Sequence, residues 1–436
     1  MIIELGRPSG VGRCLALACA LLAAGTLGCT RSPQSNRIQS MMLEPARDAE
    51  RMGDHESAFE HYKDVAEDGV VIAQYKLAQL YEKGQGTPQN DVEATRWYEA
   101  AANAGDTRAY RQLARRYERG IGVPQDEVRA YELYLKAAAA GDASAAYKVG
   151  EFLERGRGGV EDPAGAARYY QIAAEGGDES AQLALADLYR TGKGVDADPE
   201  AAERLYAEAA KTVMAKAASG NMYSQDRLGQ LYLDGKGVPK DTKAGIKWVN
   251  AAALQGNVWS QYRLARLFER GSPDVQPNAA MAARYYEMAA AQGHPGTSLT
   301  LAKMYASGNG VARDERRAAE LLQQSAAEGD PEAYVMLGDL AAGGNGIPRD
   351  DAEAIRWYTE GARHGDGTAM RKLGEAYESG RGVPQDPAVA LMWYVLSEQQ
   401  NDERAGARVQ ELTAELDPAT VSRAEGLAEA WRRGNL

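Results

Sequence analysis

Cysteine, histidine and phenylalanine are scarce in this 436-residue chain. The three cysteines, Cys14, Cys19 and Cys29, all stand near the N-terminus, so the rest of the chain can form neither a disulfide framework nor a cysteine-ligated zinc site. The four histidines are scattered, and no two stand four residues apart as a helical zinc-binding pair would. We therefore expect no metal and no cofactor.

Positive charge is also in deficit. Fifty Lys and Arg residues against 62 Asp and Glu residues give a net charge of −12, which argues against nucleic acid as a partner because phosphate binding needs a basic surface. The nucleophile motifs Ser-x-x-Lys and Gly-x-Ser-x-Gly are missing, and the Gly-x-Gly pairs follow expected helices without a P-loop Lys-Ser. The sequence therefore predicts a protein that is not an enzyme.

Long apolar runs are missing beyond the N-terminus, so no later segment is predicted to span a bilayer. Residues 14–28 form a short apolar stretch after Arg7 and Arg13, as in a secretory signal peptide, which we predict over residues 1–28. The stretch ends in Thr-Leu-Gly-Cys at residues 26–29, which resembles the lipobox of bacterial lipoproteins.

That resemblance implies lipid attachment at Cys29 and a membrane anchor. Thr30 is not the aspartate that retains such lipoproteins at the inner membrane, so the implied location is the periplasmic face of the bacterial outer membrane. The alternatives are an ordinary secretory signal, which would give a soluble periplasmic protein, or an uncleaved anchor. The polar residues 29–42 are predicted to be a flexible tether.

A pattern of about 36 residues recurs nine times between residues 71 and 401. In each copy a helix with one apolar face precedes a turn glycine, an N-capping Asp or Asn starts a second helix, and a closing Gly or Asn ends it. The capping residues are Asn90, Asp126, Asp162, Asp198, Asp241, Asn278, Asp314, Asp350 and Asp386, and the closing residues are Gly105, Gly141, Gly177, Gly220, Gly256, Gly293, Gly329, Gly365 and Asn401. A fixed period of this kind is typical of a helical solenoid.

The shared phrase is clearest in residues 369–401, with Leu373, Gly374, Trp393 and Tyr394, and it resembles the Sel1-like repeat, a relative of the tetratricopeptide repeat. The resemblance implies an all-α protein, an α/α superhelical solenoid of about nine 36-residue Sel1-like repeats with helical caps. It also implies an adaptor or assembly scaffold that binds other proteins. The shared residues are structural, so they do not identify the partner.

Segments at both ends of the repeats are predicted to be caps, which solenoids need for solubility. Residues 43–70 match the pattern in part, with Ala58, Tyr62 and Ala66 at helical spacing, and are read as a tetratricopeptide-like N-terminal cap. Residues 402–436 are expected to form two C-terminal capping helices, the last of them starting at Asp417-Pro418.

The fourth copy has 43 residues between its closing glycines, where the other spacings are close to 36. The seven added residues lie within 211–219 and predict nearly two extra helical turns, roughly 10 Å at 1.5 Å per residue. Such an extension is either a docking ridge or a bend, or an insertion tolerated at a solvent-facing helix end.

The second copy carries an unusual arginine cluster in its first helix. Arg116 occupies a position that is apolar in seven other copies. Its guanidinium either reaches solvent while the apolar part of the side chain stays buried, or it points into the groove towards an acidic partner. The candidate partner-binding residues are Arg111, Arg115, Arg116 and Arg119. The alternative is a solvated face paired with Glu118, Asp126 and Glu127.

Aromatic residues are lost in two copies. The seventh has Leu321-Leu322 where the others carry an aromatic residue, and the eighth has Ala341 where most carry Tyr. Each loss would leave a cavity, or a groove for a partner side chain, unless neighbouring side chains compensate. The remaining Trp and Tyr stripes are expected to be core.

These observations favour a lipid-anchored scaffold that organises a periplasmic or outer-membrane assembly with one or more envelope proteins. A more specific version, by analogy of architecture, is the scaffold lipoprotein of alginate-type exopolysaccharide export. Two other hypotheses remain: an envelope carbohydrate-binding protein or enzyme that uses the concave groove, and a cytoplasmic signalling regulator with an unprocessed N-terminus.

Overall fold

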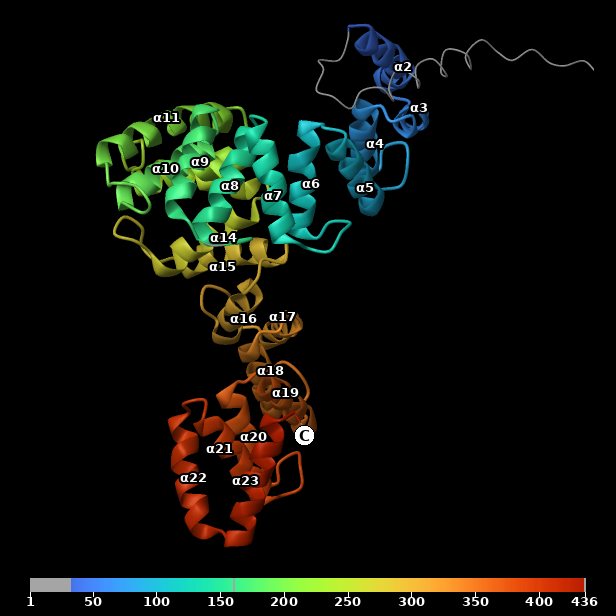
Figure 1. Ribbon diagram of the computed structural model, residues 1–436. Coiled ribbons are helices and arrows are strands. Elements are labelled where there is room, and N and C mark those ends of the chain that lie inside the picture. Colours follow the sequence, from blue (N-terminus) through green and yellow to red (C-terminus); the bar gives the residue numbers. More distant parts are fainter. Residues whose placement is uncertain (1–32, 160, 435–436) are drawn as a thin grey trace, which may run out of the picture. The chain divides into compact units, whose positions relative to one another are not determined.

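The computed structural model describes residues 33–159 and 161–434, and all the regular elements in these ranges are helices (Figure 1). The chain divides into two compact units, residues 1–209 and 210–436, with the division inside α11 (Pro199–Ala218). The lipidation prediction at Cys29 and the signal peptide predicted over residues 1–28 lie outside the described residues. Among the described helices, none is both long and apolar enough to cross a membrane.

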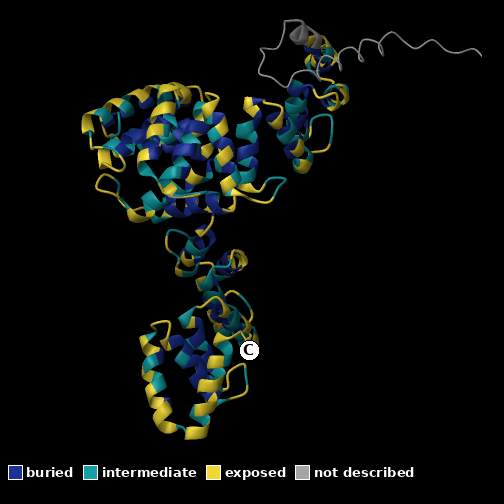
Figure 2. Ribbon diagram, in the orientation of Figure 1, coloured by how far each residue is buried: buried dark blue, intermediate teal, exposed yellow. Residues whose placement is uncertain are grey.

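The first unit contains α2 to α10. Their bounds are α2 Pro33–Met52, α3 His55–Glu67, α4 Val71–Lys83, α5 Asp91–Asn103, α6 Thr107–Arg119, α7 Glu127–Ala139, α8 Ala143–Arg155, α9 Pro163–Glu175 and α10 Glu179–Thr191. Each repeat is a helical hairpin, and its second helix also packs on the first helix of the following repeat, as α5 does on α6. Figure 2 shows the buried residues between the packed helices and the exposed residues on their outer faces.

The second unit contains α12 to α23. Their bounds are α12 Met222–Asp234, α13 Thr242–Leu254, α14 Val258–Arg270, α15 Ala279–Ala290, α16 Thr297–Ser307, α17 Glu315–Ala327, α18 Pro331–Gly343, α19 Asp351–Arg363, α20 Gly367–Ser379, α21 Pro387–Glu398, α22 Glu403–Glu415 and α23 Pro418–Arg432. The helices α22 and α23 both pack on α21, and Trp431 contacts Trp393 edge-on at 4.7 Å between ring centroids.

The helix boundaries follow from the residues that the sequence marks. All nine predicted capping residues accept a backbone N–H bond from the first turn of the second helix, as Asn90 does from Glu93 at 3.1 Å. All nine closing residues have a positive φ, and Asn401 is the only residue other than glycine with a positive φ among the described residues. These predictions are confirmed.

The second turn glycine has a role that the sequence pattern did not reveal. A Cβ on Gly122 would lie 2.1 Å from the carbonyl oxygen of Asp91 in the preceding repeat, and one on Gly382 would lie 2.4 Å from that of Asp351. The turn therefore lies directly against the start of the preceding repeat's second helix. Glycine is needed here for this close approach as well as for its positive φ.

The N-terminal segment differs from its prediction. The helix α2 begins at Pro33, so residues 33–42 are helical, and the flexible tether predicted over residues 29–42 is wrong from Pro33 onward. Leu43 and Ala46 of this helix are fully buried and join the core that contains Tyr62, so packing stabilises a helix where polar composition suggested a tether. The helix α3 supplies the predicted pair, with Ala58, Tyr62 and Ala66 buried.

The seven-residue insertion of the fourth copy is helical, as expected. The helix α11 has 20 residues, whereas α9 and α13, the second helices of the flanking repeats, have 13 each. Val213 and Ala217, in and beside the added turns, are 1% exposed, so the extension also carries a buried face.

Candidate protein-interaction site

The arginine cluster of α6 is held by carboxylates from three other segments. Arg115 pairs with Glu82 at 2.6 Å, and Arg111 pairs with Asp142 at 2.7 Å. Arg119 is exposed, and the described part of the chain gives it no ion pair. Arg111, Arg115 and Arg119 are therefore the members of the cluster that a partner can reach.

Arg116 is buried, with only 1% of its side chain exposed. Its guanidinium pairs with Asp91 at 3.2 Å and with Glu82 at 3.3 Å, and it donates to the Thr95 hydroxyl at 3.2 Å. It also lies 5.3 Å from the centre of the Tyr98 ring. The sequence left open whether this charge reaches solvent or the groove, and the structure shows that it does neither.

The acidic partners expected for the arginines differ from those found. Asp126 caps α7, while Glu118 and Glu127 bind Arg157 of the next repeat. The alternative of a solvated face paired with Glu118, Asp126 and Glu127 is therefore wrong in its partners. The contribution of the cluster to partner binding stays a prediction.

The second and third repeats each supply an arginine to the preceding repeat, but from different sequence positions. In the second repeat the helix position holds Arg116 and the turn position holds Ile121, whereas in the third repeat Phe152 stands in the helix and Arg157 in the turn. Each arginine reaches the carboxylates of the preceding repeat, and the guanidinium of Arg157 lies 4.4 Å from the centre of the Phe152 ring. At each of these two interfaces, an arginine that binds the preceding repeat is thus supplied either from the helix position or from the turn position.

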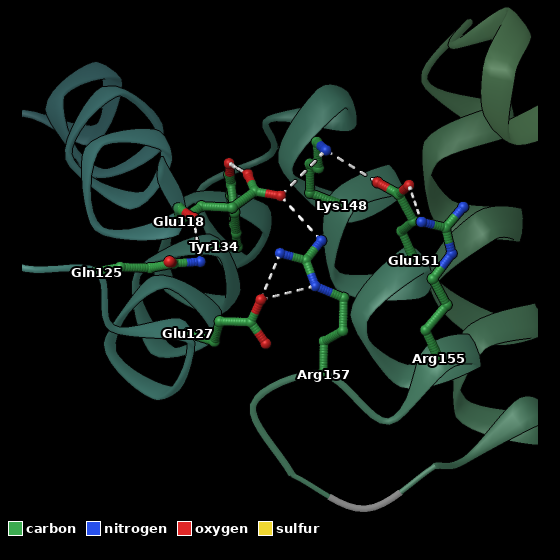
Figure 3. A network of polar contacts seen from close by, with 8 residues as sticks. All are labelled: Glu118, Gln125, Glu127, Tyr134, Lys148, Glu151, Arg155 and Arg157. Carbon is green, nitrogen blue, oxygen red and sulfur yellow. Dashed lines mark hydrogen bonds and ion pairs between the residues drawn. The ribbon is translucent and has the colours of Figure 1, made fainter. Parts of the chain in front are cut away.

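Glu118 is the centre of the polar network between the second and third repeats (Figure 3). It accepts a hydrogen bond from the Tyr134 hydroxyl at 2.7 Å and pairs with Arg157 at 3.1 Å and Lys148 at 3.5 Å. Burial opposes its ionisation, but the Tyr134 hydrogen bond and the two cations outweigh that effect and lower the pKa of the Glu118 carboxyl. Glu118 is therefore an ionised group held between two repeats.

A tyrosine hydroxyl bound to a carboxylate recurs along the chain. The pairs are Tyr62–Glu50, Tyr98–Glu82, Tyr134–Glu118, Tyr170–Glu154, Tyr206–Asp187, Tyr286–Glu269, Tyr358–Asp339 and Tyr394–Glu378. Burial, then the hydrogen bond to the carboxylate, raises the pKa of these tyrosines, in Tyr206 to about 12. The sequence analysis identified the tyrosines as core but missed their polar partners, whose signal is an acidic residue 16 positions earlier in four of the eight pairs.

Two repeats lack the tyrosine and the acidic residue together. Val249 replaces the tyrosine where Leu233 stands at the acidic position, and Leu322 replaces it where Ala306 does. Val249 and Leu322 are fully buried. A buried hydroxyl without an acceptor is costly, so the joint replacement by apolar residues is physically consistent.

The second unit exposes two large aromatic residues at equivalent positions of its first helices. Tyr223 of α12 is 69% exposed and Trp259 of α14 is 61% exposed. Trp259 packs edge-on against the His294 ring at 4.7 Å between ring centroids, and Tyr262 stacks on the same His294 ring at 4.2 Å. The Trp259 ring is therefore held by its contact with His294, while a large part of the residue remains exposed.

The described residues contain no group of three or more His, Cys, Asp and Glu side chains arranged to hold a metal ion. His55 and His61 lie on α3, and His294 and His364 lie on other segments. The Nδ1 atom of His294 is 2.9 Å from the Thr297 hydroxyl and 2.9 Å from the Pro295 carbonyl oxygen, which can only accept. The carboxylates described above are engaged by tyrosines and cations.

Comparison with known proteins places these repeats in one family. The family model for the Sel1 repeat matches residues 71–106, 107–142, 143–178, 179–211, 223–257, 260–294, 301–330, 331–366 and 367–402. A solved structure described as a protective antigen present in uropathogenic Escherichia coli strains, displaying an SLR fold, is 30% identical. The match covers 87% of this chain and 81% of that one, with a TM-score of 0.50.

A Sel1 repeat protein from Oxalobacter formigenes is 28% identical over 57% of this chain and 99% of that one, with a TM-score of 0.45. No match was found among the curated proteins.

The stacked helical hairpins and the repeat matches define a helical-repeat solenoid. The chain belongs to the Sel1 repeat family. Proteins built from this repeat generally act in protein–protein interaction and are generally not enzymes. The family predicted from the sequence is thereby confirmed.

Proposed function

We propose that this protein is a lipid-anchored scaffold of the bacterial envelope that binds one or more envelope proteins and organises a periplasmic or outer-membrane assembly. The observation that carries the proposal is the run of nine Sel1 repeats over residues 71–402, which leaves the chain little besides an interaction surface. Exposed Tyr223 and Trp259 support it, because Tyr and Trp are enriched among the residues that contribute most to protein interfaces.

The anchored location rests on the residues at the N-terminus. Residues 26–29 resemble a lipobox, and the single cysteine after the apolar stretch is Cys29. A lipid at this position would hold the repeats at a membrane surface without any spanning helix. The analogy with the scaffold lipoprotein of alginate-type export is the most specific form of this proposal and is based on architecture alone.

A carbohydrate-binding function is the second candidate, because the same exposed rings of Tyr223 and Trp259 present flat apolar faces of the kind that stack on sugars. The third, a cytoplasmic regulator, requires that the N-terminal segment is never processed. Two experiments separate these candidates.

The first experiment tests the anchor. Cells expressing the protein are labelled with radioactive palmitate and fractionated, next to a Cys29→Ala variant. We expect label and an outer-membrane location for the wild type, and neither for the variant. A wild-type protein found unlabelled in the cytoplasm would overturn the anchored scaffold and favour the regulator.

The second experiment identifies the partner. A photo-crosslinking amino acid is placed at Tyr223, Trp259, Arg111 or Arg119, with Arg168, whose side chain is 75% exposed on the second helix α9, as a control position. Reproducible adducts with one envelope protein from the first four positions and none from Arg168 would support the scaffold. Adducts with glycan only would overturn it in favour of carbohydrate binding.

Charge reversal then tests the arginine cluster. Arg119→Glu is the informative variant because Arg119 is exposed and unpaired in the described residues, whereas reversal of buried Arg116 would disturb the fold. We expect weaker, less salt-dependent binding of an acidic partner. Arg129→Glu on α7 is the control, and unchanged binding by Arg119→Glu would remove the cluster from the interface.

A further inference from the structure

The groups that bind Glu118 in the first unit recur in the second unit without that glutamate. Tyr358, Lys372 and Arg381 each stand 224 residues after Tyr134, Lys148 and Arg157. The residue 224 positions after Glu118 is Ala342. The hydroxyl and both cations are thus present, but the carboxylate they surround in the first unit is not.

A pocket occupies the corresponding place. It encloses about 300 Å³ and is lined by Ala342, Gly343, Tyr358, Lys372, Arg381 and neighbouring residues. Three small residues, Ala341, Ala342 and Gly343, stand where the second repeat has Tyr117, Glu118 and Arg119. Ala341 itself is fully buried and does not line the pocket, which lies at the next two residues of the same helix.

The carboxylates at this pocket already have partners. Asp339, one turn earlier on α18, accepts from the Tyr358 hydroxyl at 2.6 Å and pairs with Lys372 at 2.9 Å. Asp351 pairs with Arg349 at 3.2 Å, and Glu375 pairs with Arg371.

Arg381, in contrast, has no carboxylate partner in the described residues. Among the described residues no ion pair or side-chain hydrogen bond engages it, whereas its counterpart Arg157 binds both Glu118 and Glu127. The side chains of Arg381 and Ser379 are at exposed positions, so the pocket is open to solvent. A cation at an open pocket, beside a site where a glutamate is missing, favours an incoming anion of carboxylate shape.

We propose that this pocket between α18, α19 and α20 binds a glutamate side chain of a partner polypeptide, which takes the place left by Ala342 and pairs with Arg381. The inference rests on the proposed scaffold function, since it names the chemistry that the partner presents. A polypeptide glutamate is favoured as the occupant because five other repeats fill this position with a glutamate of their own chain: Glu82, Glu118, Glu154, Glu269 and Glu378.

The seventh repeat provides a natural comparison. It also has alanine at the acidic position, Ala306, but Leu322 replaces the tyrosine, so no hydroxyl is present there to be bound. That repeat removed the polar partner together with the carboxylate. The eighth repeat retained Tyr358 and Lys372, which Asp339 engages, and Arg381, which remains without a carboxylate partner in the described residues.

The test uses the full chain and the probe N-acetyl-glutamate N-methylamide, with the neutral isostere N-acetyl-glutamine N-methylamide as control. Binding is followed by the ¹⁵N guanidinium NMR signal of Arg381, assigned with an Arg381→Lys variant. We expect a saturable shift with the glutamate probe at a dissociation constant of roughly 1–10 mM, as one charge-assisted contact would give, and no saturable shift with the glutamine probe.

The variant Ala342→Glu fills the pocket with the chain's own carboxylate. We expect it to fold with a thermal midpoint at least as high as that of the wild type and to lose the response to the probe. No saturable shift in the wild type, an equal response to the glutamine probe, or an undiminished response in Ala342→Glu would each overturn the proposal. A response to free succinate but not to the blocked glutamate would overturn the polypeptide occupant.

The outcome is separate from that of the scaffold proposal. Photo-crosslinks from Tyr223 and Trp259 that survive in Ala342→Glu, together with a negative titration, would leave the scaffold standing and reject the pocket. A positive titration without any protein adduct in cells would reject the scaffold and, with it, the polypeptide occupant.

Discussion

Glu118 in the second repeat and Ala342 in the eighth occupy equivalent positions, but only the first supplies a carboxylate to the groups around it. At the first, Tyr134, Lys148 and Arg157 converge on one carboxylate, and the interface is closed by the chain itself (Figure 3). At the second, Asp339 binds Tyr358 and Lys372. A pocket remains there, and Arg381 is unpaired within the described residues. The first site thus uses its carboxylate to hold two repeats together, whereas the second is the site we propose for a partner's carboxylate.

The largest expected effect comes from the turn glycines that bring the cations of both sites to the preceding repeat. In Gly158→Ala, next to Arg157, the new Cβ would lie 2.8 Å from the carbonyl oxygen of Glu127 at a φ of +68°. We expect a loss of about 3 kcal/mol or more in the free energy of unfolding, from backbone strain plus the clash. Urea denaturation, with hydrogen exchange of α7 and α8 as a local probe, measures it.

The matched control is Gly177→Ala. Gly177 has a φ of +83° but no atom within 4 Å of the added Cβ, so only the conformational cost of about 1–2 kcal/mol applies. Equal losses in the two variants would show that the close approach at Gly158 contributes nothing.

The next effect comes from removing the carboxylate of the closed site. Glu118→Ala leaves the Tyr134 hydroxyl without its acceptor and two cations without their shared partner, because the side chain of Glu118 is only 10% exposed. We expect a loss of about 2–3 kcal/mol, read by hydrogen exchange of α6 to α8. Glu132→Ala is the control, since Glu132 is 52% exposed and, among the described residues, pairs only with Arg129. Its expected loss is under about 0.5 kcal/mol.

A smaller effect tests the exchange of arginine positions. Arg116→Leu introduces the residue type found in most other copies, but it takes away the buried cation that binds Asp91 and Glu82. We expect a loss of about 1–2 kcal/mol, because Arg115 still neutralises Glu82.

Adding Ile121→Arg to Arg116→Leu recreates the arrangement of the third repeat and should recover at least half of that loss. The coupling between the two substitutions is read from a double-mutant cycle of urea midpoints. Additive losses would mean that the two positions do not supply the same cation.

The smallest effect is the dependence on pH. The pKa of Glu118 in the folded protein lies below its ordinary value of about 4.5, so its contribution to stability is present above pH 4.5 and is lost as the pH falls through the folded pKa. Local hydrogen-exchange protection of α6 and α8 should therefore fall below pH 4.5 in the wild type. In Glu118→Gln this part of the pH dependence should be missing, and an unchanged profile would assign it to other carboxylates.

The sequence predicted features that depend on one residue and its local backbone. Asn90 and its eight equivalents cap helices because an Asn or Asp side chain reaches the free N–H groups of its own first turn. Gly105 and Asn401 end hairpins because they tolerate a positive φ. These signals need no knowledge of the neighbouring repeat, and they were sufficient for the fold.

The sequence did not predict features that depend on two repeats in contact. The burial of Arg116 becomes intelligible only when Asp91 of the preceding repeat is seen beside it, and the close approach of Gly122 only when the carbonyl of that same residue is placed. The sequence predicted room at Ala341, but that residue is fully buried and the pocket lies beside it, at Ala342 and Gly343. Its hydroxyl and cations come from α19, α20 and the turn after α20. The start of α2 at Pro33 was missed because packing stabilises that helix against its polar composition.

The length of the extra segment in α11 has a consequence for the direction of the chain. An α-helix turns by about 100° per residue, so seven added residues rotate its end by about 700°, about 20° short of two complete revolutions. The residues after α11 therefore leave from nearly the same side of that helix as they would without the insertion, and Gly220 still closes the hairpin with a φ of +92°. An insertion of five residues would send the chain out from nearly the opposite side of the helix. Seven residues therefore lengthen the helix along its axis while nearly preserving the direction in which the chain leaves it.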